Sequence, residues 1–228
     1  MSFRPPGRPK TMDIHSLYAL AFRCFRPARL RRLYKTLGIG RETRLLDIGG
    51  SADLWRLAEA EGLPLPRLTI VNPQLRRDRG LPSAEWVAGD GRELPFADGT
   101  FDVAVCNSVL EHVGDWGSQR RVAEEVRRVA RSYFVQTPDP RFPVEPHLLT
   151  PAVHWLPRKW QGRLLRNFTL WGLITRSSPE RCLRFHAELR LLNAGEMLRL
   201  FPGSRLLRER WLGLPKSLIA VYTGDTRG

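Results

Sequence analysis

The stretch from Arg44 to Trp55, RLLDIGGSADLW, places an acid, two glycines and a serine directly after a run of apolar residues. The apolar run has the composition of a buried strand, and the residues after Ser51 can begin a helix. Gly49 and Gly50 allow the backbone to approach either a ligand or a neighbouring helix closely. After the first strand of an open α/β sheet, such a turn is where an adenosine-bearing cofactor usually binds.

The chemistry of this turn favours a cationic cofactor over a dinucleotide. A dinucleotide site needs the fingerprint G-x-G-x-x-G, but the matching positions after Gly49 hold Ser51 and Leu54. Asp47 ends the strand and Asp53 lies in the first helical turn, so both carboxylates would repel a pyrophosphate. A cofactor that carries an amine and a sulfonium group suits these acidic surroundings. A nicotinamide oxidoreductase is therefore not expected.

The rest of the chain must supply the sheet that positions this turn. Alternating patterns predict strands and helices in turn as far as a fifth strand, and a helix and an antiparallel strand pair joined through Gly213 and Pro215 follow. The predicted strands are 44–48, 68–72, 85–90, 101–107, 132–137, 204–211 and 217–223, and the predicted helices are 27–40, 52–63, 117–131 and 193–201. This order predicts an open, mostly parallel, Rossmann-like α/β sheet of seven strands, with helices on both faces and an antiparallel C-terminal hairpin.

The predicted domain organisation is simple. Residues 1–12 are rich in Pro and Arg and are expected to form a flexible tail, and residues 13–228 are expected to form one domain. Residues 138–185 break the alternation of strands and helices and contain many Pro and Trp residues. We interpret them as a cap inserted after the fifth strand, over the carboxyl ends of the strands. The alternative is a surface excursion with a small hydrophobic cluster of its own.

Three stretches resemble the class I S-adenosylmethionine-dependent methyltransferases, in particular the small-molecule branch of the ubiquinone-biosynthesis type (methyltransferase type 11). They are LLDIGG at 45–50, GDGRELPFADGTFDVAVCNSVLEHV at 89–113 and FPGSRLLRERWLGLPKSLIAVY at 201–222. The second stretch is the most specific. The resemblance implies that the protein is an enzyme with S-adenosyl-L-methionine as its cofactor.

Nine residues would bind that cofactor. They are Asp47, Gly49, Gly50, Ser51, Asn72, Asp90, Gly91, Asn107 and Ser108. Asp47 can attract the ammonium group, and Asp90 can accept a hydrogen bond from the adenine amino group. The backbone carbonyls of Asn107 and Ser108 can meet the cofactor amine where the fourth strand ends.

Two of these positions depart from the pattern of the family. Its G-x-G-x-G turn becomes Gly49, Ser51 and Asp53, which is bulkier. The acid expected after the second strand, for the ribose hydroxyls, is Asn72, and an amide lacks the charge-assisted strength of a carboxylate. A binding protein with the same fold and no catalytic activity is therefore the alternative to an enzyme.

Catalysis needs a base only if the acceptor must lose a proton. His147, oriented by Glu145, is the predicted base, because Pro146 favours extended backbone and both side chains can then point the same way. The alternative is a packed histidine that is bonded to backbone. Glu111 and His112 are expected to support the fold, and no metal site is predicted. Cys106, within the fourth strand, is expected to be a core residue.

The composition limits the partners. Lys and Arg number 37 against 23 acids, which gives a net charge of +14. A basic surface for nucleic acid or an anionic membrane is one interpretation, and a coding bias toward Arg is the other. An appended RNA-binding module and the motifs of DNA methyltransferases are lacking, so nucleic acid is an unlikely partner, although an RNA methyltransferase stays an alternative. The aromatic and basic cap could instead rest on a membrane and admit a lipid-like acceptor, or cover a soluble aromatic one.

The sequence therefore predicts methyl transfer to a small-molecule or lipid-like acceptor, on oxygen in the first instance. The three cysteines are far apart, and no apolar run is long enough to cross a bilayer. We expect a cytoplasmic protein that could lie peripherally at the inner face of the membrane.

Overall fold

The computed structural model describes residues 26–73, 81–145, 150–151, 155 and 189–224 of the chain. The strands of the main sheet are β1 (Arg44–Ile48), β2 (Arg67–Asn72), β3 (Glu85–Ala88), β4 (Phe101–Asn107), β5 (Ala130–Pro138), β8 (Arg205–Trp211) and β9 (Leu214–Tyr222). The helices are α2 (Arg26–Leu37), α3 (Ala52–Ala60), the short 3₁₀ helix η1 (Leu110–His112), α4 (Trp116–Val129) and α8 (Ala194–Leu200). A two-stranded sheet of β6 (Val144–Glu145) and β7 (Thr150–Pro151) follows β5.

The seven strands lie in the order β3-β2-β1-β4-β5-β9-β8. The pairs β3–β2, β2–β1, β1–β4 and β4–β5 are parallel, whereas β5–β9 and β9–β8 are antiparallel. The predicted Rossmann-like sheet and its antiparallel C-terminal hairpin are thus confirmed. The strand order reverses between β1 and β4, which makes their carboxyl ends the switch point where ligands bind in open α/β sheets.

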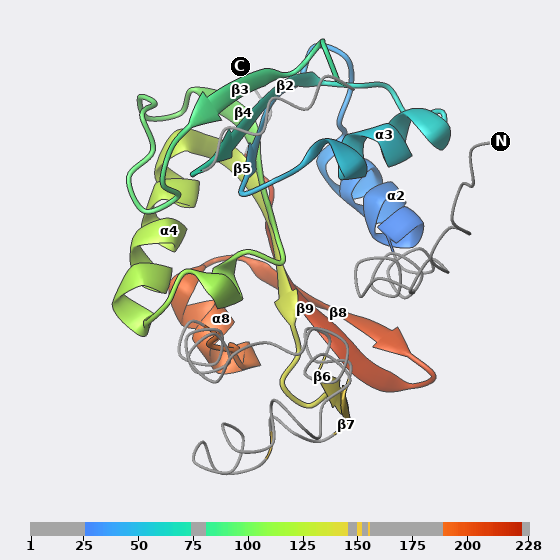
Figure 1. Cartoon of the computed structure of the whole chain (residues 1–228), viewed down its shortest axis with the longest axis vertical. Helices are drawn as coiled ribbons and strands as arrows, with labels where there is room; N and C mark the ends of the chain where they lie inside the picture. The colour runs from blue at the N-terminus through green and yellow to red at the C-terminus, as the bar shows by residue number, and fades with distance from the viewer. Residues whose placement is uncertain (1–25, 74–80, 146–149, 152–154, 156–188, 225–228) are drawn as a thin grey trace, which may run out of the picture.

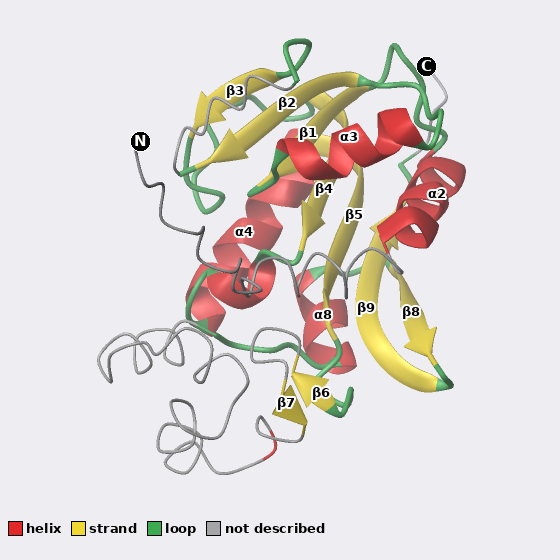
Figure 2. Cartoon of the chain, turned by 45° about the vertical axis from the view of Figure 1, so that its right-hand side comes forward, coloured by secondary structure: helices red, strands yellow, loops and turns green. Residues whose placement is uncertain are grey.

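Helices cover both faces of the sheet. Figure 1 shows α4 and α8 on one side and α2 and α3 on the other, and the turned view of Figure 2 shows α3 in front of the sheet. Each face has its own buried cluster, one with Val122 and Val126 of α4 and the other with Leu30 of α2 and Trp55 of α3. Burying each such side chain contributes about 1.5–3 kcal/mol, so the sheet is a rigid platform for its carboxyl edge.

Side-chain caps and one arginine fix the elements around this platform. Asp115 Oδ1 accepts a hydrogen bond from Ser118 N at the start of α4, and Asn193 forms a capping box with Glu196 on α8. Arg128 of α4 donates to the carbonyls of Phe96 and Leu94, which anchors the turn before β4 to the helix.

The C-terminal hairpin turns more tightly than the sequence predicts. Leu212 and Gly213 alone connect β8 to β9, and Pro215 lies within β9 instead of in the turn. Among the described residues, no helix is both long and apolar enough to cross a membrane. Of the predicted cap at 138–185, the described residues are 138–145, 150–151 and 155, and the tail at 1–12 lies outside the described residues.

Candidate cofactor site at the carboxyl ends of the strands

The glycine turn after β1 is shaped by close contacts within the protein. Gly49 has a φ of +69°, and a Cβ atom there would lie 2.7 Å from Val109 Cγ2. A Cβ atom on Gly50 would lie 1.9 Å from Asp47 Oδ2. The backbone N–H of Gly49 donates to the Val71 carbonyl at 2.7 Å, which ties the turn to β2. Both glycines are therefore required at this turn, because a side chain at either position would collide with Val109 or Asp47.

Asp47 lies directly beneath this turn and is almost completely buried, with 1% of its surface exposed. Its Oδ2 accepts a hydrogen bond from Trp55 Nε1 at 2.8 Å. Burial raises the pKa of Asp47 to about 7, although the Trp55 hydrogen bond acts in the opposite direction. A cation placed above the turn would favour the ionised form of this carboxyl group.

Ser51 and Asn72 flank the turn. Ser51 occupies the N-cap position of α3 and is exposed, but its side chain makes no capping hydrogen bond. Asn72 Nδ2 donates to the Gly50 carbonyl at 3.3 Å, so the amide at the end of β2 supports the turn itself. Its partner and its position at the strand end are compatible with the predicted role at a ribose, which stays a prediction.

Asp90 and Gly91 lie just beyond the end of β3. The Asp90 carboxylate is exposed and binds the guanidinium group of Arg92, which lowers the pKa of Asp90. An adenine amino group would have to share this carboxylate with Arg92. A Cβ atom on Gly91 would lie 3.1 Å from Ile48 Cγ2, so Gly91 packs tightly against the end of β1.

Asn107 ends β4 and Ser108 follows it. Ser108 has a φ of +55°, which is unusual for a residue with a side chain. Ser108 Oγ donates to Gln136 Oε1 of β5 at 2.8 Å. Arg29 Nη1 donates to both Asn107 Oδ1 and Gln136 Oε1, each at 2.8 Å. Helix α2 therefore fixes the orientation of the amide at the end of β4.

This Arg29 contact belongs to a buried polar network that the sequence analysis did not find. Arg29 also donates to both carboxylate oxygens of Glu209 in β8, at 2.8 and 2.6 Å, and to Ser217 Oγ at 3.3 Å. Burial acts to raise the pKa of Glu209, but Arg29, Lys216 and Ser217 together outweigh it and lower the pKa. The sequence contained one sign of this network: Arg29 stands four residues before Leu33, on the apolar face of α2.

A register shift in the hairpin brings Lys216 close to the same network. Glu209 is opposite Ser217 and Arg210 is opposite Pro215, so Lys216 is the additional residue on β9. Bulges of this kind redirect a side chain. Lys216 is 8% exposed, and burial, with the positive charge of Arg29, lowers its pKa to about 8. Near the start of β9, the buried cations Arg29 and Lys216 thus lie close to the Glu209 carboxylate.

The Glu111 side chain packs beneath the strand ends. Glu111 is fully buried, and its Oε2 accepts a hydrogen bond from Thr137 Oγ1 of β5 at 3.1 Å. Its backbone carbonyl accepts from Arg190 N at 2.9 Å. These contacts agree with the expected structural role of Glu111. Cys106, as expected, is a fully buried core residue, and burial raises the pKa of its thiol.

The predicted base lies at the boundary of the described residues. Glu145 ends β6, and its backbone pairs with Thr150 of β7. His147 lies outside the described residues, so the predicted pairing of Glu145 with His147 stays a prediction. Within the described part of the chain, no group of three or more His, Cys, Asp or Glu residues could hold a metal ion.

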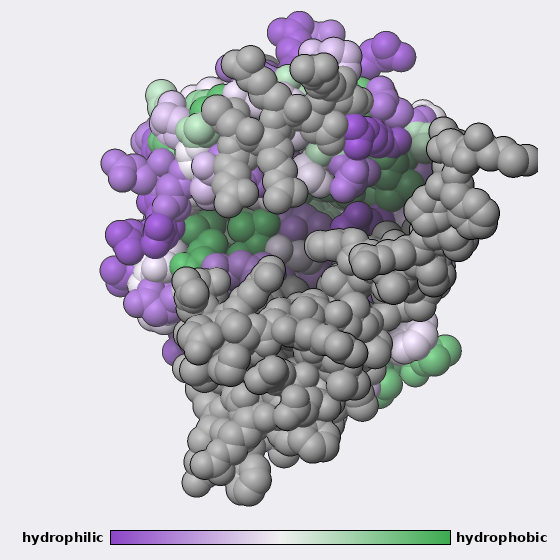
Figure 3. All heavy atoms as spheres, viewed as in Figure 1, coloured by the Kyte–Doolittle hydropathy of each residue, from purple (hydrophilic) through white to green (hydrophobic). Residues whose placement is uncertain are grey.

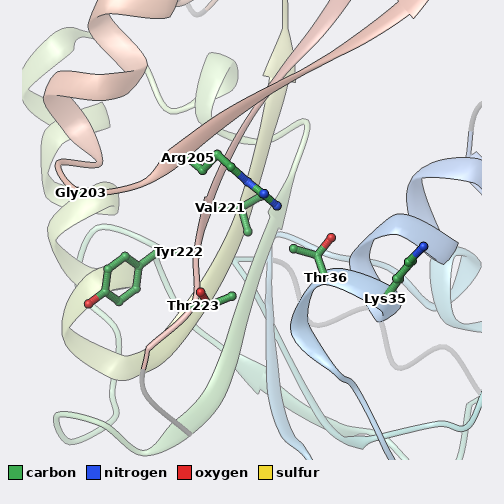
Figure 4. A pocket seen from close by; sticks show the side chains of 7 residues that line it. All are labelled: Lys35, Thr36, Gly203, Arg205, Val221, Tyr222 and Thr223. Carbon is green, nitrogen blue, oxygen red and sulfur yellow. The ribbon is translucent and has the colours of Figure 1, made fainter.

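A separate hollow lies at the opposite edge of the sheet. It has a volume of about 620 Å³ and lies between the end of α2 and the outer ends of β8 and β9. Figure 4 shows Arg205 directed toward the last turn of α2, where Lys35 and Thr36 lie, whereas Tyr222 points away. Arg205 and Tyr222 lie near the amino end of β5, so this hollow is distinct from the candidate cofactor site.

Comparisons with known proteins agree with the fold. Residues 53–133 match the profile of a methyltransferase domain family. Over 93 residues, the chain is 36% identical to an uncharacterised methyltransferase of Mycobacterium sp. (strain JLS), a match that covers 38% of this chain and 34% of that protein. The chain thus matches about a third of the length of this relative.

Solved structures share the fold over most of the chain. The PH0226 protein of Pyrococcus horikoshii is 16% identical, with a TM-score of 0.57 and coverage of 91% of each chain. The N-terminal domain of EvdMO1, solved with SAH bound, is 19% identical, with a TM-score of 0.50 and coverage of 88% of this chain and 81% of that one. At these identities the likeness establishes the Rossmann-like methyltransferase fold.

Proposed function

We propose that this protein transfers a methyl group from S-adenosyl-L-methionine to a small-molecule or lipid-like acceptor, at an oxygen atom. The match of residues 53–133 to a methyltransferase domain supports the proposal, as does the fold shared with a domain that was solved with SAH bound. One observation carries it: the buried carboxyl group of Asp47 lies beneath a glycine turn at the switch point of the sheet.

The residues at the strand ends fit this cofactor. The turn itself carries acidic and neutral side chains, which suit a cation and disfavour a pyrophosphate. Asp47 would attract the ammonium group, Asn72 would meet the ribose hydroxyls and Asp90 would accept a hydrogen bond from the adenine amino group. Gly49, Gly50 and Gly91 add no side chain of their own at this edge, and Ser51 borders it.

The bound cofactor supplies an electrophilic methyl group on a positively charged sulfur. The contribution of the protein is alignment, because an in-line displacement depends on the orientation of the two reactants. Arg29 donates a hydrogen bond to the Oδ1 atom of Asn107, and the Nδ2 group of the same side chain can therefore donate to another acceptor. The backbone carbonyls of Asn107 and Ser108 end the fourth strand beside the predicted site of the cofactor amine.

Proton removal from a hydroxyl acceptor would require a base. We propose His147 for this role, with Glu145 as the carboxylate that orients it, both at the start of the cap. The ubiquinone-biosynthesis branch, a cytoplasmic location and a lipid-like acceptor belong to the same proposal. The resemblance of residues 89–113 supports the branch, the apolar and basic composition of residues 154–173 supports the lipid-like acceptor, and the widely spaced cysteines support the cytoplasmic location.

Calorimetry and turnover assays test the proposal together. The full chain should bind S-adenosylmethionine and SAH, and it should release SAH in the presence of a phenolic or quinol-type acceptor. Binding of SAH without turnover on small-molecule, lipid-like or RNA acceptors would favour a non-catalytic binding protein. Turnover on RNA alone would favour an RNA methyltransferase, and the failure of both ligands to bind would refute the cofactor site.

A further inference from the structure

The tip of the β8–β9 hairpin exposes large apolar side chains. Leu212 is 82% exposed, Trp211 is 45% exposed and Leu214 is 44% exposed. The hairpin projects from the body of the molecule in Figure 1, and Figure 3 shows hydrophobic surface at the same place, at the lower right. Three adjacent apolar side chains at the end of a projecting hairpin form a patch of the kind that marks an interaction site. We call Trp211, Leu212 and Leu214 the hairpin tip.

The backbone conformation of this turn does not explain why residue 212 is a leucine. Leu212 has a φ of +48° and Gly213 a φ of +80°. Two-residue hairpin turns with positive φ at both positions favour Asn-Gly or Asp-Gly, and a bulky residue is strained there. An asparagine at position 212 would suit the turn better and would expose no apolar surface. The exposed leucine therefore serves neither the turn nor the core.

The charges around the tip are positive. Arg208 and Arg210 are exposed and form no ion pair with the described residues. Glu209, the acid between them, is turned inward and bound to Arg29. An apolar tip with flanking arginines matches the interface of an anionic bilayer, where Trp and Leu enter the headgroup region and arginines meet phosphates.

The tip projects from the same edge of the sheet as the candidate cofactor site. Ser217 of β9 is opposite Pro138, the last residue of β5, and the tip extends beyond this pair. Phe142, which follows β5, contacts Trp211 with a distance of 6.1 Å between ring centroids. A surface bound at the tip would thus face the carboxyl ends of the strands.

We propose that the hairpin tip inserts into the headgroup region of an anionic phospholipid bilayer, with Arg208 and Arg210 bound to lipid phosphates. This contact does not require methyl transfer. Its use in delivering a lipid-like acceptor to the cofactor does rest on the function proposed above.

Sedimentation of the full chain with vesicles tests this proposal. Vesicles of phosphatidylglycerol and phosphatidylcholine should bind the wild-type protein, and vesicles of phosphatidylcholine alone should bind it less. The double variant Leu212→Asn/Leu214→Thr should lower the partition coefficient about tenfold, because two apolar contacts are lost. Its thermal stability should not fall, since asparagine suits position 212 and threonine suits a strand.

Two further variants make the test specific. Leu198→Gln on α8 removes an apolar side chain of similar exposure, 44%, and should leave vesicle binding unchanged. Arg208→Gln/Arg210→Gln should reduce the preference for anionic vesicles, because two of the cations nearest the inserted tip are lost. Equal binding by wild type and the tip variant would overturn the proposal. The proposal would also be overturned if the wild-type protein did not bind vesicles and instead formed a dimer in sedimentation velocity that the tip variant could not form. Calorimetry with S-adenosylmethionine reports separately on the proposed function, because the tip variant leaves the cofactor site intact.

Discussion

Arg29 and Glu209 lie 180 residues apart in the sequence and form a largely buried, bidentate ion pair that holds helix α2 against strand β8. Their side chains are 9% and 12% exposed. The same guanidinium group also reaches Asn107 and Gln136 at the ends of β4 and β5. The pair therefore connects the last hairpin, the first described helix and the candidate site.

Removing one partner of this pair should destabilise the protein strongly. Glu209→Ala leaves the Arg29 charge buried without its carboxylate, which typically costs about 3–5 kcal/mol. Urea denaturation should show this loss, whereas the double variant Arg29→Met/Glu209→Leu should recover much of it. As a control, Arg67→Gln at the exposed pair with Glu42 should leave the denaturation midpoint unchanged. Similar midpoints for Glu209→Ala and wild type would contradict the role of the pair.

Asp47 should make the stability depend on pH. Its pKa is about 7 in the folded protein and about 3.9 in an unfolded chain, so the folded state binds more protons between these values. The contribution of Asp47 to stability therefore falls as the pH rises from about 4 to about 7. Asp47→Asn keeps an oxygen for Trp55 and removes this dependence. Between pH 5 and 8, the free energy of unfolding of the wild type should fall by roughly 2 to 3 kcal/mol relative to that of the variant, as measured by urea denaturation. A constant difference would show that Asp47 does not titrate in this range.

Gly50 should tolerate no side chain. In Gly50→Ala the new Cβ atom would lie 1.9 Å from Asp47 Oδ2, so the turn or the buried carboxyl group must move. We expect a loss of about 2 kcal/mol or more in stability and weaker cofactor binding. Gly40→Ala is the matched control, because nothing lies within 4 Å of its Cβ position. Equal stability and equal cofactor affinity of Gly50→Ala and Gly40→Ala would contradict the geometry of the turn.

Asp90→Ala should weaken the binding of S-adenosylmethionine several-fold or more, because a charge-assisted hydrogen bond to adenine is lost. Asp102→Ala provides the control: Asp102 also binds an arginine, Arg44, but it lies at the amino end of β4. Calorimetry should show unchanged affinity for the control. Unchanged affinity for Asp90→Ala as well would remove Asp90 from the site.

His147→Ala should reduce turnover and leave cofactor affinity unchanged, since a base acts on the acceptor and not on the cofactor. The pH profile of the turnover rate should no longer show the ionisation of the His147 side chain. Full activity in the variant, measured by release of SAH, would exclude His147 from this role.

The sheet could be predicted because most of its strands combine an apolar run with flanking turn residues. The buried runs at 44–48 and 101–107 match β1 and β4 in full. The hairpin turn was placed less well, because Pro215 is typical of a turn although β9 includes it. The predicted C-terminal pair was otherwise correct.

The contacts of the site residues could not be predicted in the same way. The order of Asp47, Gly49 and Gly50 along the chain indicated a turn, but not that Asp47 would be enclosed beneath it and bonded to Trp55. The network of Arg29, Asn107 and Glu209 joins segments that are distant in sequence, and no local pattern reports such pairs. Arg29 on an apolar helix face was the only local sign of it.

A crystal structure of the full chain with SAH would test the central claim most directly. The claim predicts the ligand at the carboxyl ends of β1 and β4, beside Gly49, with its adenine near Asp90 and its amine near Asn107. A ligand bound elsewhere on the chain, or an edge beside Gly49 filled by the protein's own side chains, would contradict it.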